Sequence, residues 1–330
     1  MFNRRMSLLL EDGRIVPPPH SLVVNPGSDT DLSLFPKDGL TAVEDTQPVY
    51  DRLVAEGVSA VPSFTQLEGR SAFVALRLPR SRDAARVAIA NAVALVEPGA
   101  LVLIDGQKTD GVDSIYKEIR KRVPVLDTLT KAHGRSFWFE ATDAFADWAE
   151  HGREWTKVGG YVTAPGVFSA DGIDPGSDLL ADALPDDVSG YGADLGAGWG
   201  YLSAKLLRSR GVAKLDLVEA SHLALSAARL NVTDERAAFH WADATSWTAS
   251  GRLDFVVTNP PFHTGRKAEP ELGKAFIRSA AKLLKPSGRL FLVANRHLPY
   301  EAILSERFGK VDEISGNGSF KVIRASKPGA

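Results

Sequence analysis

The stretch "YGADLGAGWGYLS", Tyr191 to Ser203, sets three alternating glycines between a short apolar run and a helix-like segment. Glycine lets the backbone turn sharply and approach a ligand closely, where a side chain would stand in the way. A dinucleotide fingerprint reads G-x-G-x-x-G, whereas this loop reads G-x-G-x-G, with Asp194 two residues before the first glycine. The stretch therefore predicts a nucleotide-type loop between a strand and a helix of an α/β fold.

Strand-like and helix-like segments alternate after this loop. The apolar runs "KLDLVEA", "AAFHWAD", "LDFVVTN" and "RLFLVAN" are separated by helical text such as "SHLALSAARLN" and "ELGKAFIRSAAKLLKPSG". This alternation predicts a mainly parallel sheet with covering helices. Because the carboxyl ends of parallel strands meet at one edge, residues that follow successive strands should lie close together.

Acidic or amide residues stand at four successive strand ends of this sheet: Asp194, Glu219, Asp243 and Asn259. A glutamate after the second strand can accept hydrogen bonds from both hydroxyls of a ribose. Alone, Glu219 or Asp243 would more often be a solvated carboxylate or a helix N-cap. In order after Asp194, at spacings of 25 and 24 residues, they predict a nucleotide site along the carboxyl edge of the sheet.

The fourth strand ends in "NPPF", Asn259 to Phe262. Pro260 and Pro261 lack backbone N–H donors and have fixed φ angles, so the chain continues neither as a helix nor as a central strand. The sequence thus predicts a stiff loop that holds Asn259 and Phe262 in place.

Composition limits the kind of protein. The chain has 330 residues, 44% of them apolar, which suffices for two domains of ordinary size. It has no cysteine, which excludes disulfides and thiolate chemistry and suits a reducing cytoplasm. The net charge of −2 excludes a polycation that coats nucleic acid. No apolar run is long enough for a membrane span. The histidines form no ligand cluster, so we expect no metal. We expect a cytoplasmic protein that is a monomer.

The two halves of the chain repeat each other. Proline- and glycine-rich text between residues 157 and 180 predicts a boundary near residue 150, giving domains 1–150 and 151–330. The segment beginning "FVALRLPRSRDAAR" can be aligned with "FVVTNPPFHTGRKAE". Further on, the segment that begins at Tyr116 aligns with the one that begins at Tyr300. This predicts an internal duplication. The alignment puts "ALRLP", Ala75 to Pro79, where the second half has "TNPPF", so the N-terminal copy should be catalytically silent.

These motifs, in this order, resemble the class I S-adenosylmethionine-dependent methyltransferases, whose first motif is similar to "DLGAGWG". The "NPPF" tetrapeptide is similar to that of the branch that methylates exocyclic amines. With "NPPFHTG", "VANRHLPYE", "SFKVIRA" and "PGVFS", the chain resembles the bacterial ribosomal RNA guanine-N2 methyltransferases of the RsmC and RlmG type. A modest departure is Ala197, where a cysteine is common.

The resemblance implies two tandem Rossmann-like domains, with a mainly parallel seven-stranded sheet in the C-terminal copy and a degenerate N-terminal copy. It implies methylation of a guanine N2 amine in ribosomal RNA, with 16S rRNA favoured over 23S rRNA, and S-adenosylmethionine as cofactor. The residues expected to bind the cofactor are Asp194, Gly196, Ala197, Gly198, Gly200, Glu219, Asp243, Ala244 and Asn259. Those expected to carry the chemistry are Asn259, Pro260, Pro261 and Phe262.

A guanine amine is a poor nucleophile because its lone pair is delocalised into the ring. If Asn259 Oδ1 and the Pro260 carbonyl each accept one N–H, the lone pair is aimed at the methyl group. Phe262 can then stack on the base, while His263 either contacts the substrate or is merely structural. The target base must be unpaired or flipped out.

The rest of the RNA must be bound by a surface outside the pocket. We assign that role to the N-terminal copy, with Arg120, Lys121 and Arg122 meeting phosphates of ribosomal RNA or of a subunit assembly intermediate.

Two other functions remain open from the residues alone. One is methylation of a different nitrogen, namely adenine N6, cytosine N4 or a protein glutamine. The other is a non-catalytic RNA-binding or assembly protein built from two retired methyltransferase folds.

Overall fold

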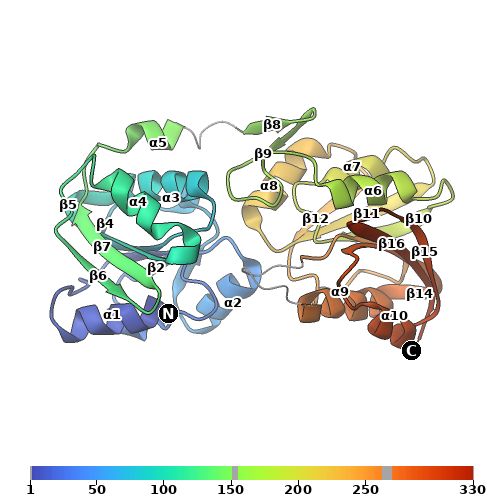
Figure 1. Ribbon diagram of the computed structural model, residues 1–330, viewed down its shortest axis with the longest axis horizontal. Helices are drawn as coiled ribbons and strands as arrows, with labels where there is room; N and C mark the ends of the chain where they lie inside the picture. Colours follow the sequence, from blue (N-terminus) through green and yellow to red (C-terminus); the bar gives the residue numbers. More distant parts are fainter. Residues whose placement is uncertain (1, 151–154, 262–269, 330) are drawn as a thin grey trace. The chain divides into compact units, whose positions relative to one another are not determined.

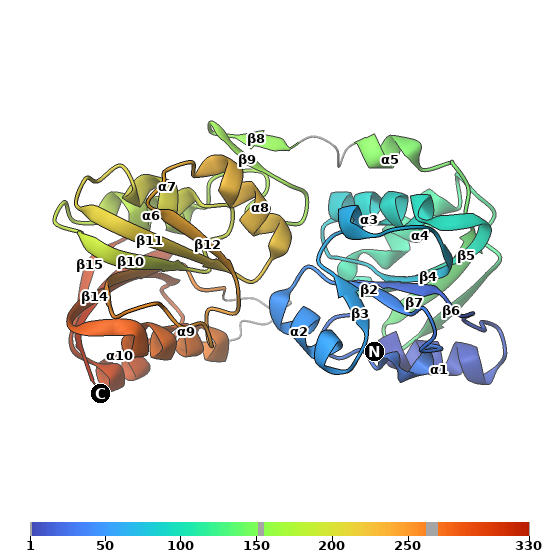
Figure 2. The ribbon, with the colours of Figure 1, turned by 180° about the vertical axis from the view of Figure 1, so that it is seen from behind.

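The computed structural model describes residues 2–150, 155–261 and 270–329. Contacts divide the chain into two compact units, which are described separately (Figures 1 and 2). The N-terminal unit is Met1–Trp155 with Ala164–Gly166, and the C-terminal unit is Thr156–Thr163 with Val167–Ala330.

The N-terminal unit is a seven-stranded sheet in the order β3-β2-β1-β4-β5-β7-β6. Its strands are β1 (Ser21–Val24), β2 (Thr41–Val43), β3 (Ser59–Val61), β4 (Ser71–Arg77), β5 (Val96–Gln107), β6 (Asp127–Lys131) and β7 (Gly134–Glu140). Its helices are α1 (Phe2–Glu11), α2 (Gln47–Ala55), α3 (Arg82–Ala94), α4 (Val112–Ile119) and α5 (Ala146–Glu150). Single-turn 3-10 helices span Leu32–Leu34, Phe64–Gln66 and Lys108–Asp110.

The C-terminal unit repeats this arrangement with the order β12-β11-β10-β13-β14-β16-β15. Its strands are β10 (Gly190–Leu195), β11 (Val212–Glu219), β12 (Ala237–Trp241), β13 (Leu253–Thr258), β14 (Leu284–Asn295), β15 (Phe308–Gly316) and β16 (Phe320–Pro328). Its helices are α6 (Pro175–Ala183), α7 (Tyr201–Leu206), α8 (His222–Asn231), α9 (Pro270–Leu283) and α10 (Glu301–Arg307). A small hairpin, β8 (Thr156–Val158) and β9 (Tyr161–Thr163), precedes α6.

Both sheets are parallel except for one strand, β7 or β16, which pairs antiparallel with both of its neighbours. The identical strand order confirms the fold class and the duplication that the sequence predicts. In each sheet the strand order reverses between the first strand and the fourth, β1 and β4 or β10 and β13. Ligands of open α/β folds bind outside the carboxyl ends of the strands at such a switch point.

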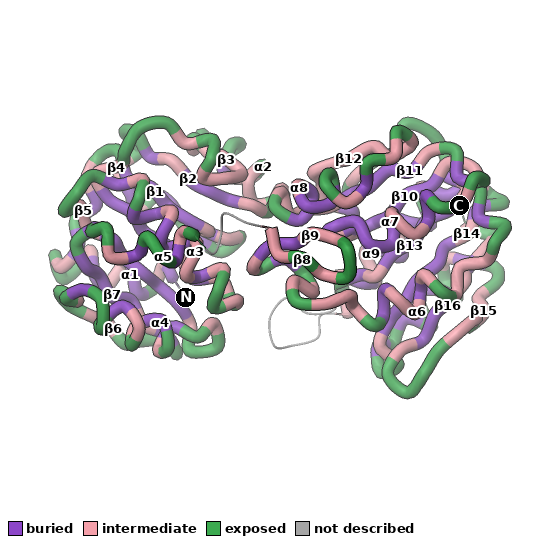
Figure 3. The backbone as a smooth tube through the Cα atoms, turned by 90° about the horizontal axis from the view of Figure 1, so that it is seen from above, coloured by how far each residue is buried: buried purple, intermediate pink, exposed green. Residues whose placement is uncertain are grey.

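Helices cover both faces of each sheet, so the strands are buried on both sides. In the N-terminal unit, Val74 and Leu76 of β4 join one core cluster with α3 and α4, while Phe73 and Ala75 join the opposite cluster with α1 and α2. In the C-terminal unit, α9 and α10 pack on one face and α6, α7 and α8 lie over the other (Figure 1). Figure 3 shows that the buried residues run along the strands.

The register of pairing corrects one detail of the internal alignment. Val24 pairs with Leu76 of β4, and its counterpart Leu195 pairs with Thr258 of β13. Arg77 therefore stands where the second unit has Asn259. Laying "FVALR" on "FVVTN" gives the same result, whereas matching "ALRLP" with "TNPPF" residue by residue is one position out. In a strand, a shift of one residue moves a side chain to the other face.

The paired tyrosines of the sequence alignment do not coincide either. Tyr116 lies in the middle of α4, whereas Tyr300 is the N-cap of α10. Sequence matching failed here because residues 120–126 separate α4 from β6, whereas α10 runs directly into β15.

Candidate functional site

The glycine loop between β10 and α7 requires its glycines. Gly196, Gly198 and Gly200 have φ angles of 75°, 55° and 87°, in the left-handed region that other residues rarely adopt. A Cβ at Gly198 would meet no atom within 4 Å, so the loop is open on that side. Ala197 is buried and donates its N–H to the Val218 carbonyl at 3.1 Å. The loop thus leaves its open face to a ligand.

Glu219, at the end of β11, lies beside this loop. Its Oε2 accepts the Gly198 N–H at 2.8 Å, and its Oε1 accepts the Ser221 N–H at 2.8 Å. The carboxylate therefore positions the loop as well as standing where the sequence expects a ribose acceptor.

Asp194 lies beneath the loop and not on its open face. Its side chain is fully buried, and Oδ2 accepts the Ser203 hydroxyl at 2.7 Å. Oδ1 has no hydrogen-bond partner within the described part of the chain. Burial raises the pKa of Asp194 to about 7, with a smaller contribution from the Glu219 charge, while the Ser203 hydrogen bond opposes the shift.

Asp243 follows β12 and folds the chain into a turn. Its Oδ1 accepts both the N–H and the hydroxyl of Thr245, at 2.8 and 2.7 Å. The neighbouring Ala244 is buried, and its carbonyl accepts the Ser279 hydroxyl at 2.7 Å. These bonds fix the turn that follows β12, where the sequence predicts two cofactor-binding residues.

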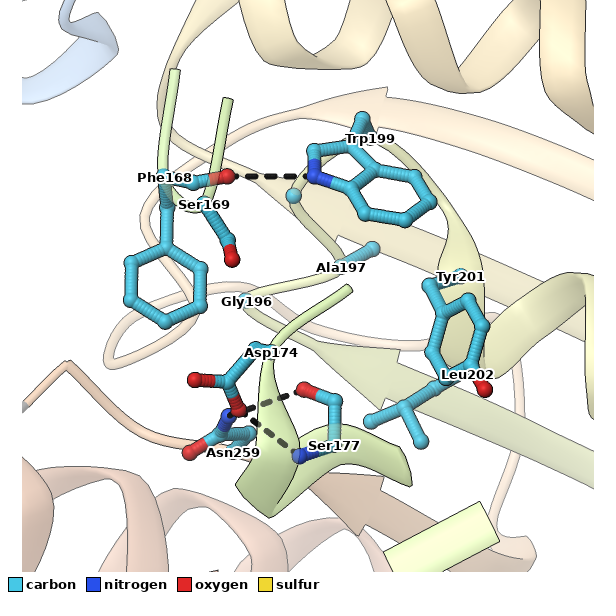
Figure 4. A pocket seen from close by; sticks show the side chains of 11 residues that line it. Phe168, Ser169, Asp174, Ser177, Gly196, Ala197, Trp199, Tyr201, Leu202 and Asn259 are labelled. Carbon is cyan, nitrogen blue, oxygen red and sulfur yellow. Dashed lines mark hydrogen bonds between the residues drawn. The ribbon is translucent and has the colours of Figure 1, made fainter. Parts of the chain in front are cut away.

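Asn259, directly after β13, lies against the first turn of α6 (Figure 4). Its Nδ2 donates to Asp174 Oδ2 and to Ser177 Oγ, both at 2.9 Å. Asp174 is the N-cap of α6, and the same Oδ2 accepts the Ser177 N–H at 2.7 Å. Figure 4 shows the Asn259 oxygen turned away from both partners.

Asn259, Asp174 and Ser177 line one pocket together with the glycine loop. Its other lining residues are Phe168, Ser169, Gly196, Ala197, Gly198, Trp199, Tyr201 and Leu202. The pocket therefore brings together the first and fourth strand ends, as the sequence predicts. Glu219 and Asp243 are not among the residues that line it.

The loop after Asn259 is described only in part. Pro260 is buried and Pro261 is exposed. Phe262 and His263, for which the sequence predicts base stacking and a substrate contact, lie outside the described residues.

The site residues predicted from the sequence omit seven of the residues that line the pocket, namely Phe168, Ser169, Asp174, Ser177, Trp199, Tyr201 and Leu202. Trp199 donates its indole N–H to the Phe168 carbonyl at 3.1 Å, and the Phe168 ring is 57% exposed at the pocket. Asp174 and Ser177 had a local signal, since Asp followed by Pro is typical of a helix start. Nothing in the sequence indicates that this helix start meets Asn259, 85 residues further on.

The basic run of the N-terminal unit divides into two parts. Arg122 pairs with Asp147 through two hydrogen bonds, of 2.6 and 2.7 Å, and lies over the Trp148 ring. It therefore ties the end of α4 to α5. Arg120 and Lys121 are exposed.

Arg120 borders a groove with a charged and aromatic lining, which we call the α4 groove. The groove is lined by Asp113, Tyr116, Lys117, Arg120 and Arg135. The Arg135 guanidinium lies 4.1 Å from the Tyr116 ring centroid, and that of Arg120 lies 5.6 Å from it.

The described residues contain neither a candidate membrane helix nor a candidate metal cluster. No helix there is both long and apolar enough to cross a membrane. Nor do three or more His, Asp or Glu side chains of these residues gather in a group able to hold a metal ion.

The family model described as "Methyltransferase small domain" matches residues 160–324. A "Ribosomal RNA small subunit methyltransferase C" of Klebsiella pneumoniae is 32% identical over 252 residues, covering 74% of this chain and 73% of the relative. A protein of the same name from Erwinia tasmaniensis is 31% identical over 255 residues, covering 76% and 74%.

One solved structure resembles the whole chain. It is described as the T. thermophilus 16S rRNA N2 G1207 methyltransferase (RsmC) in complex with AdoMet and guanosine. The TM-score is 0.80 at 26% identity, and the match covers 95% of this chain and 90% of the other.

Proposed function

Because the chain belongs to the methyltransferase small domain family, together with the ribosomal RNA small subunit methyltransferase C proteins, we propose that it methylates ribosomal RNA. The methyl donor is S-adenosylmethionine, and the acceptor is the exocyclic N2 amine of a guanosine in 16S rRNA. The relatives named for the small subunit and the solved structure with AdoMet and guanosine support this choice.

The observation that carries the proposal is the placement of Asn259 in one pocket with the glycine loop. A methyl donor on the loop and an amine at Asn259 would then face each other across a short space. Such proximity accounts for a large part of the rate of a two-substrate reaction.

The residues present fit the cofactor. Gly196 and Gly198 line the pocket with backbone alone, in a loop whose positive φ angles favour glycine. We assign the ribose hydroxyls to Glu219, and we keep Asp243 and Ala244 as cofactor-binding residues. When bound, the cofactor supplies a methyl group on a sulfonium. The rest of the cofactor leaves as a neutral thioether, which needs no acid.

The chain's own residues act on the amine. The Asn259 side-chain oxygen accepts one N–H of the guanine amine, and the Pro260 carbonyl accepts the other. These two acceptors draw the nitrogen toward tetrahedral geometry, so its lone pair points at the methyl group. The nitrogen then carries the positive charge until a proton leaves to solvent.

The N-terminal unit holds the RNA in this proposal. The α4 groove presents Lys117 and Arg120 beside Tyr116, a mixture of cations and ring that suits phosphates and unpaired bases. Arg135 lies over the same ring but pairs with Asp113 at 3.1 Å. Lys121 adds an exposed charge beside it. We assign Arg122 a structural role, because Asp147 already engages its guanidinium.

Ribosomal RNA or a subunit assembly intermediate is thus the partner, and the site of action is the cytoplasm. One chain carries both an RNA surface and a methyl-transfer site, so a monomer suffices.

The test is methyl transfer to 16S rRNA and to small subunits from a strain that lacks this gene product. Nucleosides are then identified by mass spectrometry. N2-methylguanosine at one position is the expected product. A methylated adenine or cytosine would reassign the acceptor, and no methyl transfer to either RNA substrate would reject the function.

A further inference from the structure

The contacts of the Asn259 amide group point to a function for the first turn of α6. A primary amide has two N–H donors and one acceptor oxygen. Asp174 Oδ2 and Ser177 Oγ take one donor each, at 2.9 Å. The oxygen is therefore the one polar atom of this amide left to meet the substrate.

The orientation of an asparagine amide is otherwise weakly determined. A half-turn about its last bond exchanges oxygen and NH2 with little change in shape. In the exchanged form, Asn259 would present N–H donors to a guanine amine that itself has donors to offer. A carboxylate accepts hydrogen bonds and donates none, so Asp174 excludes the exchanged form.

Asp174 is itself held in place. The oxygen that binds Asn259 also accepts the Ser177 N–H at 2.7 Å, as the N-cap of α6. Pro175 at the first helical position fixes the backbone beside it. The helix start is therefore a rigid mount for the carboxylate.

The N-terminal unit offers an internal comparison. Its helix α1 precedes the first strand and contacts β6, as α6 precedes β10 and contacts β15. In the first turn of α1, Asn3 binds the backbone of Asp29 and of Asp31. The position of Asn259 is taken by Arg77, which donates to the Pro26 carbonyl at 3.0 Å. Asn3 and Arg77 thus bond to the segment between β1 and β2. In the C-terminal unit, the helix start bonds instead to Asn259.

We propose that Asp174 and Ser177 are positioning residues that hold the Asn259 oxygen toward the substrate amine. The proposal rests on the proposed amine methylation and adds the residues that orient its acceptor. Neither residue takes a proton or bonds to the methyl group in this role.

The test compares kcat and KM for methyl transfer to 16S rRNA in purified full-length variants. Asp174→Ala should lower kcat roughly 10- to 100-fold with little change in KM for the RNA, because a misplaced acceptor costs turnover. Asp174→Asn, whose amide oxygen can accept the same two bonds, should restore most of the rate. Asp182→Ala, an exposed acid further along α6, is the matched control and should behave as wild type.

A double-mutant cycle separates positioning from general damage. In an Asn259→Ala background, Asp174→Ala should have no further effect on kcat, because the amide it orients is gone. Melting temperature and S-adenosylhomocysteine binding report whether each variant is folded. If Asp174→Ala does not fold, Ser177→Ala removes one of the two acceptors, keeps the backbone cap and should lower kcat by a smaller factor.

The outcomes are distinguishable from failure of the proposed function. Wild-type protein that methylates no RNA rejects that function. Active wild-type protein with an equally active Asp174→Ala, or with additive losses in the cycle, overturns the positioning role alone.

Discussion

Glu44 and Glu219 occupy the same position in the two units and accept the same two hydrogen bonds. Each carboxylate binds the N–H of a loop glycine, Gly27 at 3.2 Å and Gly198 at 2.8 Å. Each also accepts the N–H of the residue two positions later in the sequence, Thr46 at 2.9 Å and Ser221 at 2.8 Å. This carboxylate therefore supports the loop after the first strand even in the copy that lacks the G-x-G-x-G sequence.

The paired glutamates give a matched test of the ribose role. Glu219→Ala should weaken S-adenosylmethionine binding by about 1–3 kcal/mol, because two hydroxyls lose their acceptor. Glu44→Ala removes the equivalent loop support in the other unit and should leave cofactor affinity unchanged. Calorimetric titration of both folded variants measures the difference. Equal affinities for the two variants would contradict the ribose role of Glu219.

Asn259→Ala should separate binding from turnover. Cofactor affinity should stay within a few-fold of wild type, because the glycine loop and Glu219 are intact. The methyl-transfer rate should fall on the order of 100- to 1,000-fold, as when a preorganised polar group is removed from a transition state. Single-turnover assays with labelled cofactor measure the rate. Near wild-type transfer would reject Asn259 as the amine acceptor.

We expect one cofactor per chain. In the N-terminal unit the Arg77 guanidinium lies against the loop that follows β1, where it is bonded to the Pro26 carbonyl and to Asp29. A Cβ at Gly27 would come within 2.6 Å of it, so the side chain fills the space that the second unit leaves open at Gly198. Calorimetry should give a stoichiometry close to one. A value near two would show that the N-terminal copy also binds cofactor.

Asp194 predicts a pH dependence of stability. Its pKa is raised to about 7 in the folded chain and returns to the ordinary value near 4 on unfolding. The folded state keeps this proton at a higher pH than the unfolded state does. The contribution of protonated Asp194 to the free energy of unfolding is therefore complete below about pH 4 and is lost as the pH rises through 7. Asp194→Asn lacks this loss, so it should exceed wild type by roughly 2–4 kcal/mol at pH 8.

Denaturant unfolding of the cofactor-free proteins at pH 4.5, 6 and 8 measures this effect. The advantage of Asp194→Asn should grow with pH. A difference that does not change with pH would mean that Asp194 is already ionised throughout.

The α4 groove predicts a salt effect on RNA binding. Replacing Lys117, Arg120 and Lys121 by alanine should weaken binding and lower the log–log salt slope by about 0.7 to 0.9 per lost phosphate contact. Arg122→Ala is the control, because Asp147 engages this guanidinium; it should lower stability and leave the slope unchanged. Titration of labelled rRNA fragments at several salt concentrations measures the slopes. An unchanged slope in the triple variant would remove the groove from the RNA surface.

Much of the fold could be predicted from the sequence because its signals are local. Glycines at 196, 198 and 200 predict a tight loop, since their backbone angles are closed to other residues. Apolar runs that alternate with helical segments predict a parallel sheet, and a parallel sheet brings Asp194, Glu219, Asp243 and Asn259 to one edge. Those inferences need periodicity and connection rules, not contacts.

The tertiary structure decided what depends on register and on long-range contact. The pairing of β4 with β1 decided between two ways of aligning the halves and put Arg77, not Leu76, at the position of Asn259. Strand packing buried Asp194 beneath the loop and raised its pKa, although the sequence places it with the cofactor ligands. The start of α6 met Asn259 across 85 residues of chain. Hydrogen bonds of this kind form between side chains that the folded sheet brings together, and no spacing along the chain encodes them.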